Sequence, residues 1–148
     1  MMIRVEKSRE YIFKDLLNRA MNYGLGVECV HIDSHLKPCL SYKRKLIILN
    51  MNYHNQRLVI FQLAHEIGHF LNGDSFGNEI FFSPAMNGFE GRANKTAVKL
   101  LLPYYLNDLP ERYASTADFM NYFSIPLSVE KVVTEQIQDF YKSSETQI

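Results

Sequence analysis

Two histidines and a glutamate lie close together in the segment Ala64-His65-Glu66-Ile67-Gly68-His69. On a helix, four residues make just over one turn, so His65 and His69 project from one face and their ring nitrogens can converge on one metal ion. Glu66 lies about 100° around the helix from His65, beside such an ion. From there it can accept a proton from a water molecule that the metal activates. The spacing therefore predicts a metal site with a carboxylate base next to it.

The alternative for these residues is an ordinary packing role. A single histidine on an apolar helix is usually a hydrogen-bonded core residue. Here two histidines and a glutamate lie on a helix that is otherwise almost entirely apolar, and burying three such groups costs free energy unless each has a partner. The spacing is also the H-E-x-x-H arrangement of zinc metalloproteases. We therefore favour the metal interpretation.

A catalytic zinc site usually has three protein ligands, so a third ligand is needed. Glu90 begins the segment Glu90-Gly91-Arg92-Ala93-Asn94, at the start of a predicted helix with small residues on its inner face. Asn94, one turn further on, could accept a hydrogen bond from the outer ring nitrogen of His65. The alternative for Glu90 is an acidic residue favoured near a helix N-terminus by the helix dipole. Because the two histidines need a carboxylate, we favour the ligand role.

The elements that must position these residues follow from the apolar periodicity. It predicts five helices, over residues 8–23, 57–71, 89–102, 115–123 and 128–141. It also predicts three strands, over residues 25–32, 39–42 and 46–49, joined by connections short enough for a mainly antiparallel meander. The active-site helix 57–71 is apolar nearly all round, which is typical of a central buried helix.

Other features concern the ends of these elements. Pro103 is expected to end the third helix, and residues 74–88 are expected to form a long, functional loop. The tail 142–148 is polar, and we expect it to be disordered. The order of helix, small sheet and further helices predicts a single α+β domain over residues 1–148.

Composition narrows the class of protein. Hydrophobic residues make up 47% of the 148 residues and charged residues 22%, which is ordinary for a globular domain. Sixteen basic residues balance sixteen acidic ones, so the positive field that drives nucleic-acid binding is missing and no direct nucleic-acid binding is expected. The sequence offers neither a signal peptide nor a membrane span, and we expect a cytoplasmic protein with Cys29 and Cys39 reduced.

With both motifs in view, the sequence resembles the ImmA/IrrE family of small bacterial and phage metallopeptidases. The resemblance rests on His65-Glu66-Ile67-Gly68-His69, then Glu90-x-x-Ala93-Asn94, then Leu100-Leu101-Leu102-Pro103, and it covers roughly residues 20 to 135. It implies a zincin-like fold and a zinc-dependent peptidase, with His65, His69 and Glu90 as ligands and Glu66 as general base. It places Asn94 where thermolysin-like enzymes carry an aspartate that contacts a metal ligand.

The resemblance also implies a substrate. Members of the family cleave, or relieve the action of, a helix-turn-helix (Xre-type) repressor of a phage or mobile element, which would be the protein partner here. One Zn²⁺ per chain is expected, with Mn²⁺ as an open alternative. The residue that stabilises the oxyanion is left open among eight candidates: Tyr104, Tyr105, Tyr113, Arg92, Arg112, His31, His35 and His54.

Two other functions compete with the peptidase. The first is an anti-repressor that binds the repressor without cutting it and uses the metal only to hold helices together. The second is a metal-free helical interaction domain. The presence of Glu66 favours the peptidase, because a structural site has no need of a general base and normally fills its fourth ligand position with protein.

Overall fold

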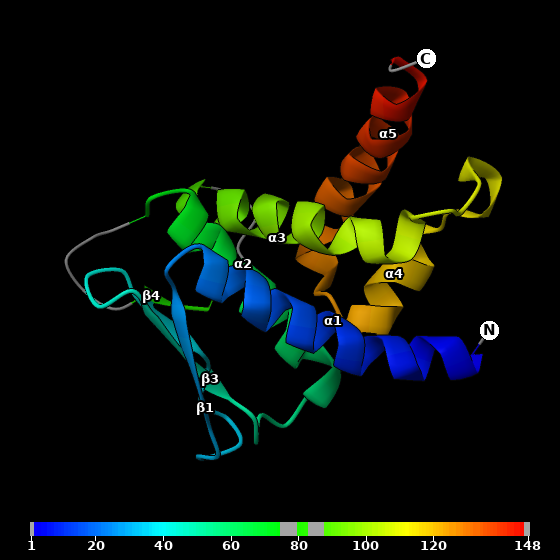
Figure 1. Ribbon diagram of the computed structural model, residues 1–148. Coiled ribbons are helices and arrows are strands. Elements are labelled where there is room, and N and C mark those ends of the chain that lie inside the picture. Colours follow the sequence, from blue (N-terminus) through cyan, green and yellow to red (C-terminus); the bar gives the residue numbers. More distant parts are fainter. Residues whose placement is uncertain (1, 75–79, 83–87, 147–148) are drawn as a thin grey trace.

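The computed structural model describes residues 2–74, 80–82 and 88–146, which form five α-helices and a four-stranded sheet (Figure 1). In chain order the elements are α1 Met2–Asn22, β1 Gly26–Val30, β2 Cys39–Ser41, β3 Leu46–Asn50, α2 Val59–Leu71, β4 Ile80–Phe81, α3 Gly88–Leu106, α4 Thr116–Phe123 and α5 Glu130–Thr146. Short 3-10 helices precede α2, α4 and α5. The α+β class and the five helices are confirmed.

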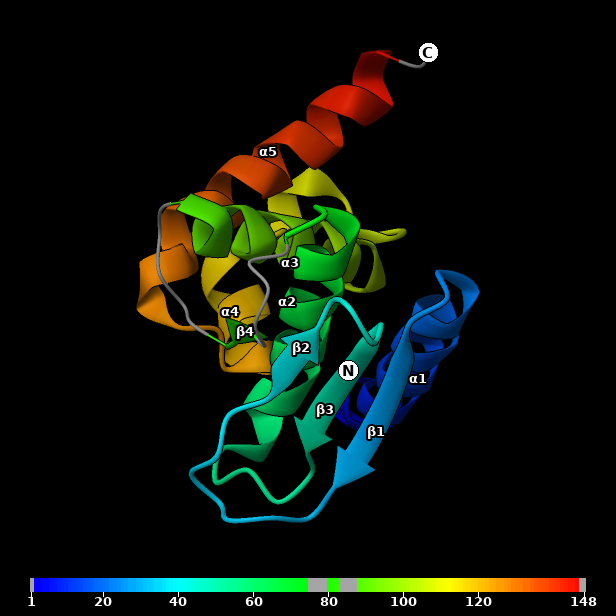
Figure 2. The ribbon, with the colours of Figure 1, turned by 90° about the vertical axis from the view of Figure 1, so that its left-hand side faces the viewer.

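The order of the strands differs from a meander. The sheet runs β1-β3-β2-β4, with β1 parallel to β3 and the other two pairs antiparallel. Figure 2 shows β1 and β3 running in the same direction. The segment that connects β1 to β2 passes the end of β3, so that β3 can lie between the two strands. The buried side chain of Asn50 fixes this segment by donating from Nδ2 to the carbonyl oxygens of Asp33 and Leu36. The β2–β3 hairpin forms as expected, but β1 joins the far side of β3.

Two consequences follow from this strand order. Cys29 lies on β1 and Cys39 on β2, so β3 separates them and neither cysteine forms a disulfide bond. The two-residue strand β4 falls inside the segment expected to be a loop, and it pairs with β2. The remainder of that expected loop, residues 75–79 and 83–87, lies outside the described residues.

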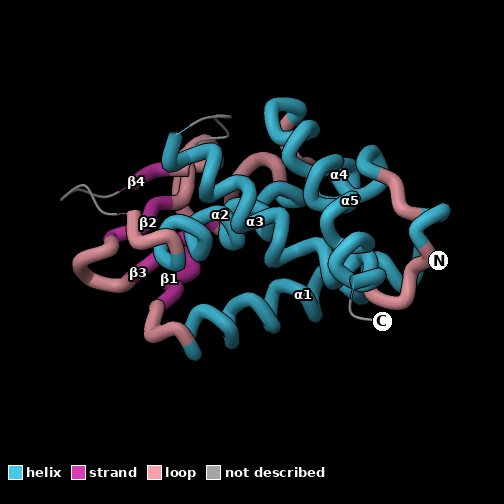
Figure 3. Tube along the Cα trace, turned by 90° about the horizontal axis from the view of Figure 1, so that it is seen from above, coloured by secondary structure: helices cyan, strands magenta, loops and turns pink. Residues whose placement is uncertain are grey.

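The helices lie on one side of the sheet (Figures 1 and 3). Leu40, Ile47 and Leu49 are fully buried strand residues of the core. Helix α2 is the centre of the domain, because every residue from Val59 to His69 is buried. Its position between the sheet and α3 takes the H-E-x-x-H segment out of contact with solvent.

Three helix ends differ from expectation. Helix α1 begins at Met2 because residues 2–7 contain good helix formers and no breaker. Helix α3 continues through Pro103 to Leu106. Pro103 has no N–H to donate to the carbonyl of Lys99, but both residues are exposed, so water can satisfy that carbonyl. Helix α5 continues to Thr146, past the start of the expected disordered tail.

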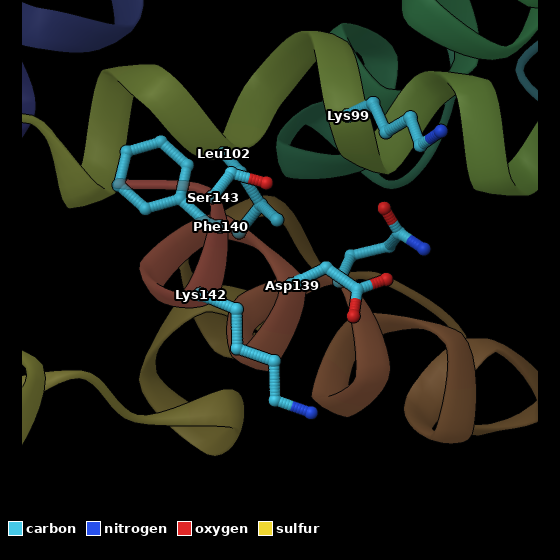
Figure 4. A pocket seen from close by; sticks show the side chains of 7 residues that line it. Lys99, Leu102, Asp139, Phe140, Lys142 and Ser143 are labelled. Carbon is cyan, nitrogen blue, oxygen red and sulfur yellow. The ribbon is translucent and has the colours of Figure 1, made fainter. Parts of the chain in front are cut away.

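The C-terminal half of α3 and α5 form a groove of about 500 Å³ (Figure 4). It is lined by Lys99, Leu102, Gln136, Asp139, Phe140, Lys142 and Ser143. Lys99 is nine residues beyond Glu90, which corresponds to roughly 14 Å along the helix axis at 1.5 Å per residue. The groove is therefore separate from the histidines of α2. Among the described residues, no helix combines the length and the apolar character needed to cross a membrane.

Candidate metal centre

The two histidines of α2 lie side by side in the interior. His65 and His69 are both fully buried, and their ring centroids are 4.6 Å apart with the ring planes nearly perpendicular. This is the arrangement that a spacing of four residues on a helix produces. Apolar rings surround the pair, with Phe82 centred 4.9 Å from His65 and Phe89 centred 5.5 Å from His69.

Helix α3 brings a carboxylate to the same point. The two helices approach closely because Gly68 has no side chain: a Cβ there would lie 2.8 Å from the carbonyl oxygen of Ala93. This approach carries Glu90, in the first turn of α3, up to both histidines. Its Oε1 atom lies 3.4 Å from Nε2 of His65 and closer still to Nε2 of His69. One possible ligand atom from each of the three residues lies within 4.8 Å of the other two.

The opposite ring nitrogens of the histidines are held by hydrogen-bond partners. Nδ1 of His65 lies 2.6 Å from Oδ1 of Asn94, where the sequence placed an outer-sphere partner. Nδ1 of His69 lies 2.8 Å from Oδ2 of Asp74, a residue that sequence reasoning assigned only to the following loop. These contacts orient the rings so that both Nε2 atoms face Glu90. Asp74 also approaches Arg92, whose Nη2 is 3.7 Å from Oδ1.

The three converging residues pass a test for metal binding. Nε2 of His65, Nε2 of His69 and Oε1 of Glu90 are buried and have no partner with hydrogen-bond geometry in the described structure. Leaving such atoms without a partner costs free energy, and a cation at their meeting point would satisfy all three. Two imidazoles and one carboxylate are a ligand set that zinc uses in catalytic sites. This group could therefore hold a metal ion.

His65, His69 and Glu90 change one another's pKa values. Burial alone would raise the pKa of Glu90, but the neighbouring His65 and His69 outweigh burial and lower it to about 2. Burial lowers the pKa of His65. Burial would also lower the pKa of His69, but the carboxylates of Glu90 and Asp74 outweigh it, and the pKa is raised. Glu90 thus stays ionised, as a carboxylate ligand must be.

A comparison with protein families shows which known proteins this chain is related to. Residues 23–132 match the peptidase M78 family model, described as the IrrE N-terminal-like domain. The chain belongs to this family. The match includes the histidines of α2 and Glu90 of α3, and it confirms the resemblance to ImmA/IrrE proteins. No curated protein and no solved structure gives a match.

Membership of the IrrE-type peptidase family indicates a metallopeptidase, and it directs attention to Glu66. This residue is fully buried on α2, and both of its carboxylate oxygens lack hydrogen-bond partners among the described residues. Burial raises its pKa well above the usual value, and the negative charge of Glu90 raises it further. A carboxylate with a raised pKa beside a metal site is suited to accepting and returning a proton.

The structure places several oxyanion candidates of this IrrE-type domain in other contacts. The hydroxyl of Tyr104 donates to Asp15 of α1, and the hydroxyl of Tyr105 accepts from the backbone N–H of Ser115. Tyr113 is 60% exposed beneath the guanidinium of Arg112. His31, His35 and His54 are exposed near the end of the sheet. Arg92 is linked to His69 through Asp74.

Proposed function

We propose that this protein is a zinc-dependent endopeptidase in which His65, His69 and Glu90 hold the metal and Glu66 is the general base. The observation that carries the proposal is the convergence of three buried ligand atoms that contact one another without hydrogen-bond geometry, next to a buried carboxylate that has no hydrogen bond among the described residues. A structural site has no use for the second feature.

The metal ion and the side chains of the protein would have different roles in peptide hydrolysis. When bound, zinc supplies Lewis acidity toward a peptide carbonyl and a water molecule. Glu66 accepts the proton of the attacking water and returns it to the leaving amine. Asn94 and Asp74 keep the rings of His65 and His69 in place. The packing of α2 between the sheet and α3 excludes bulk water and strengthens the electrostatic interactions within the site.

We further propose that the substrate is a helix-turn-helix (Xre-type) repressor of a phage or mobile element, and that cleavage relieves repression. Membership of the IrrE-type family supports this substrate class. The balance of sixteen basic and sixteen acidic residues is in keeping with a protein partner rather than a nucleic acid.

The test combines metal analysis with a cleavage assay on the repressor encoded beside this protein. Wild-type protein should hold about one zinc ion per chain, whereas His65→Ala and His69→Ala should lose it. Glu66→Gln should keep the fold and the zinc, and its cleavage rate should fall by about 10²–10⁴-fold, because only the proton acceptor is removed. Lys95→Ala, an exposed change on α3, is the matched control and should behave as wild type.

Each alternative function gives a different result. Loss of zinc from Glu66→Gln would make Glu66 a ligand rather than a base. Relief of repression by a zinc-loaded variant that cannot cleave would establish a binding anti-repressor with a structural metal. Absence of bound metal from the wild-type protein would favour the third function, a metal-free helical interaction domain.

A further inference from the structure

Unsatisfied buried polar atoms are concentrated in one place in this protein. Seven such side-chain atoms occur in the described residues, and all belong to Gln62, His65, Glu66, His69 and Glu90. A metal ion accounts for three of them, namely the two Nε2 atoms and Oε1 of Glu90. The other four are the amide nitrogen and oxygen of Gln62 and both carboxylate oxygens of Glu66. Gln62 has no role in the site described above.

Helix geometry places Gln62 on the face that carries the metal site. At about 100° per residue, Glu66 lies about 40° from Gln62 around α2, and His69 lies about 20° from it on the other side. Residues four apart on a helix have Cβ atoms about 5–6 Å apart, which is within reach of a hydrogen bond between a glutamine and a carboxylate. Gln62 and Glu66 are therefore neighbours one turn apart.

The burial of Gln62 is difficult to explain by packing alone. Its exposed fraction is 0%, and both polar atoms of its amide lack partners among the described residues. An apolar side chain of the same length would fill this space without the cost of desolvating an amide. Every other residue of α2 from Val59 to Ala64 is apolar. A polar residue at this position is therefore best explained by a polar neighbour that needs it.

We propose that Gln62 is a positioning residue for Glu66 in the zinc-loaded protein, where its Nε2–H group donates a hydrogen bond to the ionised Glu66 carboxylate and holds it toward the metal site. This inference rests on the proposed role of Glu66 as general base. An ionised carboxylate has only acceptor positions, and the amide nitrogen of Gln62 is the unpartnered donor beside it on the same helix face. A hydrogen bond to an ionised acceptor is stronger than one between neutral groups.

The choice of Glu66 as the partner follows from the other groups on this face. The Nε2 atoms of His65 and His69 face Glu90 rather than the N-terminal part of α2. Their Nδ1 atoms are already held by Asn94 and Asp74. Glu90 contacts both histidines from α3. Apart from Oε1 of Glu90, which the metal would contact, and the amide oxygen of Gln62 itself, the acceptor atoms on this face that lack a donor among the described residues are those of Glu66.

The first experiment observes the pair directly, by nuclear magnetic resonance of the side-chain amide groups in ¹⁵N-labelled, zinc-loaded full-length protein. The Gln62 amide pair is assigned by through-bond correlation and by its absence in Gln62→Met. On Glu66→Gln, the Gln62 amide resonances should shift more than those of Gln136. Gln136 is the matched control because it is 6% exposed, also on a helix, and lines the separate groove between α3 and α5. Unchanged Gln62 resonances would overturn the proposal, and this readout does not depend on how well Gln62→Met folds.

The second experiment separates positioning from packing. Gln62→Met should bind zinc as wild type does, and its kcat on the repressor should fall by roughly 10–100-fold with KM unchanged, the range typical of residues that orient a catalytic group. Added to Glu66→Gln, the same change should have no further effect, because the group it positions is already gone. An equal loss in both backgrounds would overturn the proposal. Absence of zinc from wild-type protein would instead overturn the proposed function.

Discussion

Oδ2 of Asp74 lies 2.8 Å from Nδ1 of His69, on the side of the ring that faces away from Glu90. Asn94 holds His65 in the corresponding way, but through a neutral amide oxygen. The two histidines of one site are thus held by partners of different charge. A carboxylate raises the basicity of the imidazole it contacts more than an amide does, so Asp74 should contribute to metal affinity as well as to orientation.

Replacing Asp74 with alanine should weaken zinc binding by about 10–100-fold, because His69 loses the acceptor that fixes its ring. Asp74→Asn should recover part of this loss, since an amide oxygen can still accept the hydrogen bond. Competition with a chromogenic chelator measures both affinities. Arg92→Ala is the control: the Arg92 side chain is 64% exposed and its Nη2 contacts Asp74 only at 3.7 Å, so its effect should be small. Equal affinities of Asp74→Ala and wild type would show that His69 is oriented by its packing alone.

Replacing the residues of α3 should separate a ligand from an outer partner. Glu90→Ala removes a ligand atom and should abolish stoichiometric zinc binding. Asn94→Ala leaves all three ligand atoms in place and should reduce affinity by about 10–100-fold. Equilibrium dialysis against zinc at several concentrations distinguishes the two outcomes. If Glu90→Ala retained wild-type affinity, the third ligand would lie elsewhere, first of all in the segment 74–87.

The clustering of His65, His69 and Glu90 followed from the sequence more directly than the strand order did. The spacing of His65 and His69 determines their geometry once they are on a helix, and a carboxylate four residues before Asn94 completes a pattern of known spacing. Asp74 could not be assigned this way, because its contact depends on how the chain turns after α2. That turn uses Gly73 in the left-handed region, with φ of 73°, and returns Asp74 to the helix it has just left. The signal was Asn72-Gly73 followed by an acidic residue, which is common in surface turns as well.

The order of the strands in the sheet could not be predicted from the sequence for a similar reason. Short connections favour neighbouring strands, and the segment 31–38 looked like a simple link between β1 and β2. Its path is set by the buried side chain of Asn50, at the end of β3, which bonds to the backbone of this segment from a distance of 14 to 18 residues. Periodicity reports which face of a strand is buried, but it carries no information on such a long-range polar contact. The expectation that Pro103 ends its helix was wrong, because a helix can accommodate proline at an exposed position.

Gly68 offers a test of how closely the helices must approach. A methyl group at this position would meet the backbone oxygen of Ala93 at 2.8 Å and Cβ of Thr96 at 3.2 Å. Overpacking typically costs about 1–3 kcal/mol, whereas alanine favours a helix over glycine by about 1 kcal/mol. Because the obstacle is backbone, we expect Gly68→Ala to lower the free energy of unfolding and, by displacing α3 with Glu90, to weaken zinc binding.

Urea unfolding and chelator competition measure the two effects of Gly68→Ala. Gly26→Ala serves as the control, because a Cβ there would meet its nearest atom at an ordinary 3.4 Å. Gly68→Ala with wild-type stability and wild-type zinc affinity would mean that α3 can move aside without disturbing the site.

Tyr104 allows the contact between α1 and α3 to be tested through pH. Its hydroxyl donates to Asp15, which belongs to the helix that precedes the family match. Burial raises the pKa of Tyr104, the Asp15 carboxylate raises it further, Arg19 opposes them, and the result is about 12, compared with an ordinary value of 10. A pKa raised by folding means that the folded state holds this proton more tightly than the unfolded state. The corresponding stability is fully present below pH 10 and is lost as the pH rises toward 12.

Tyr104→Phe has no such proton, so the free energy of unfolding of wild type should fall toward that of the variant across this window. Urea unfolding of both proteins at several pH values tests this. A constant difference between them from pH 9 to 12 would show that the hydroxyl does not hold α1 against α3 through Asp15.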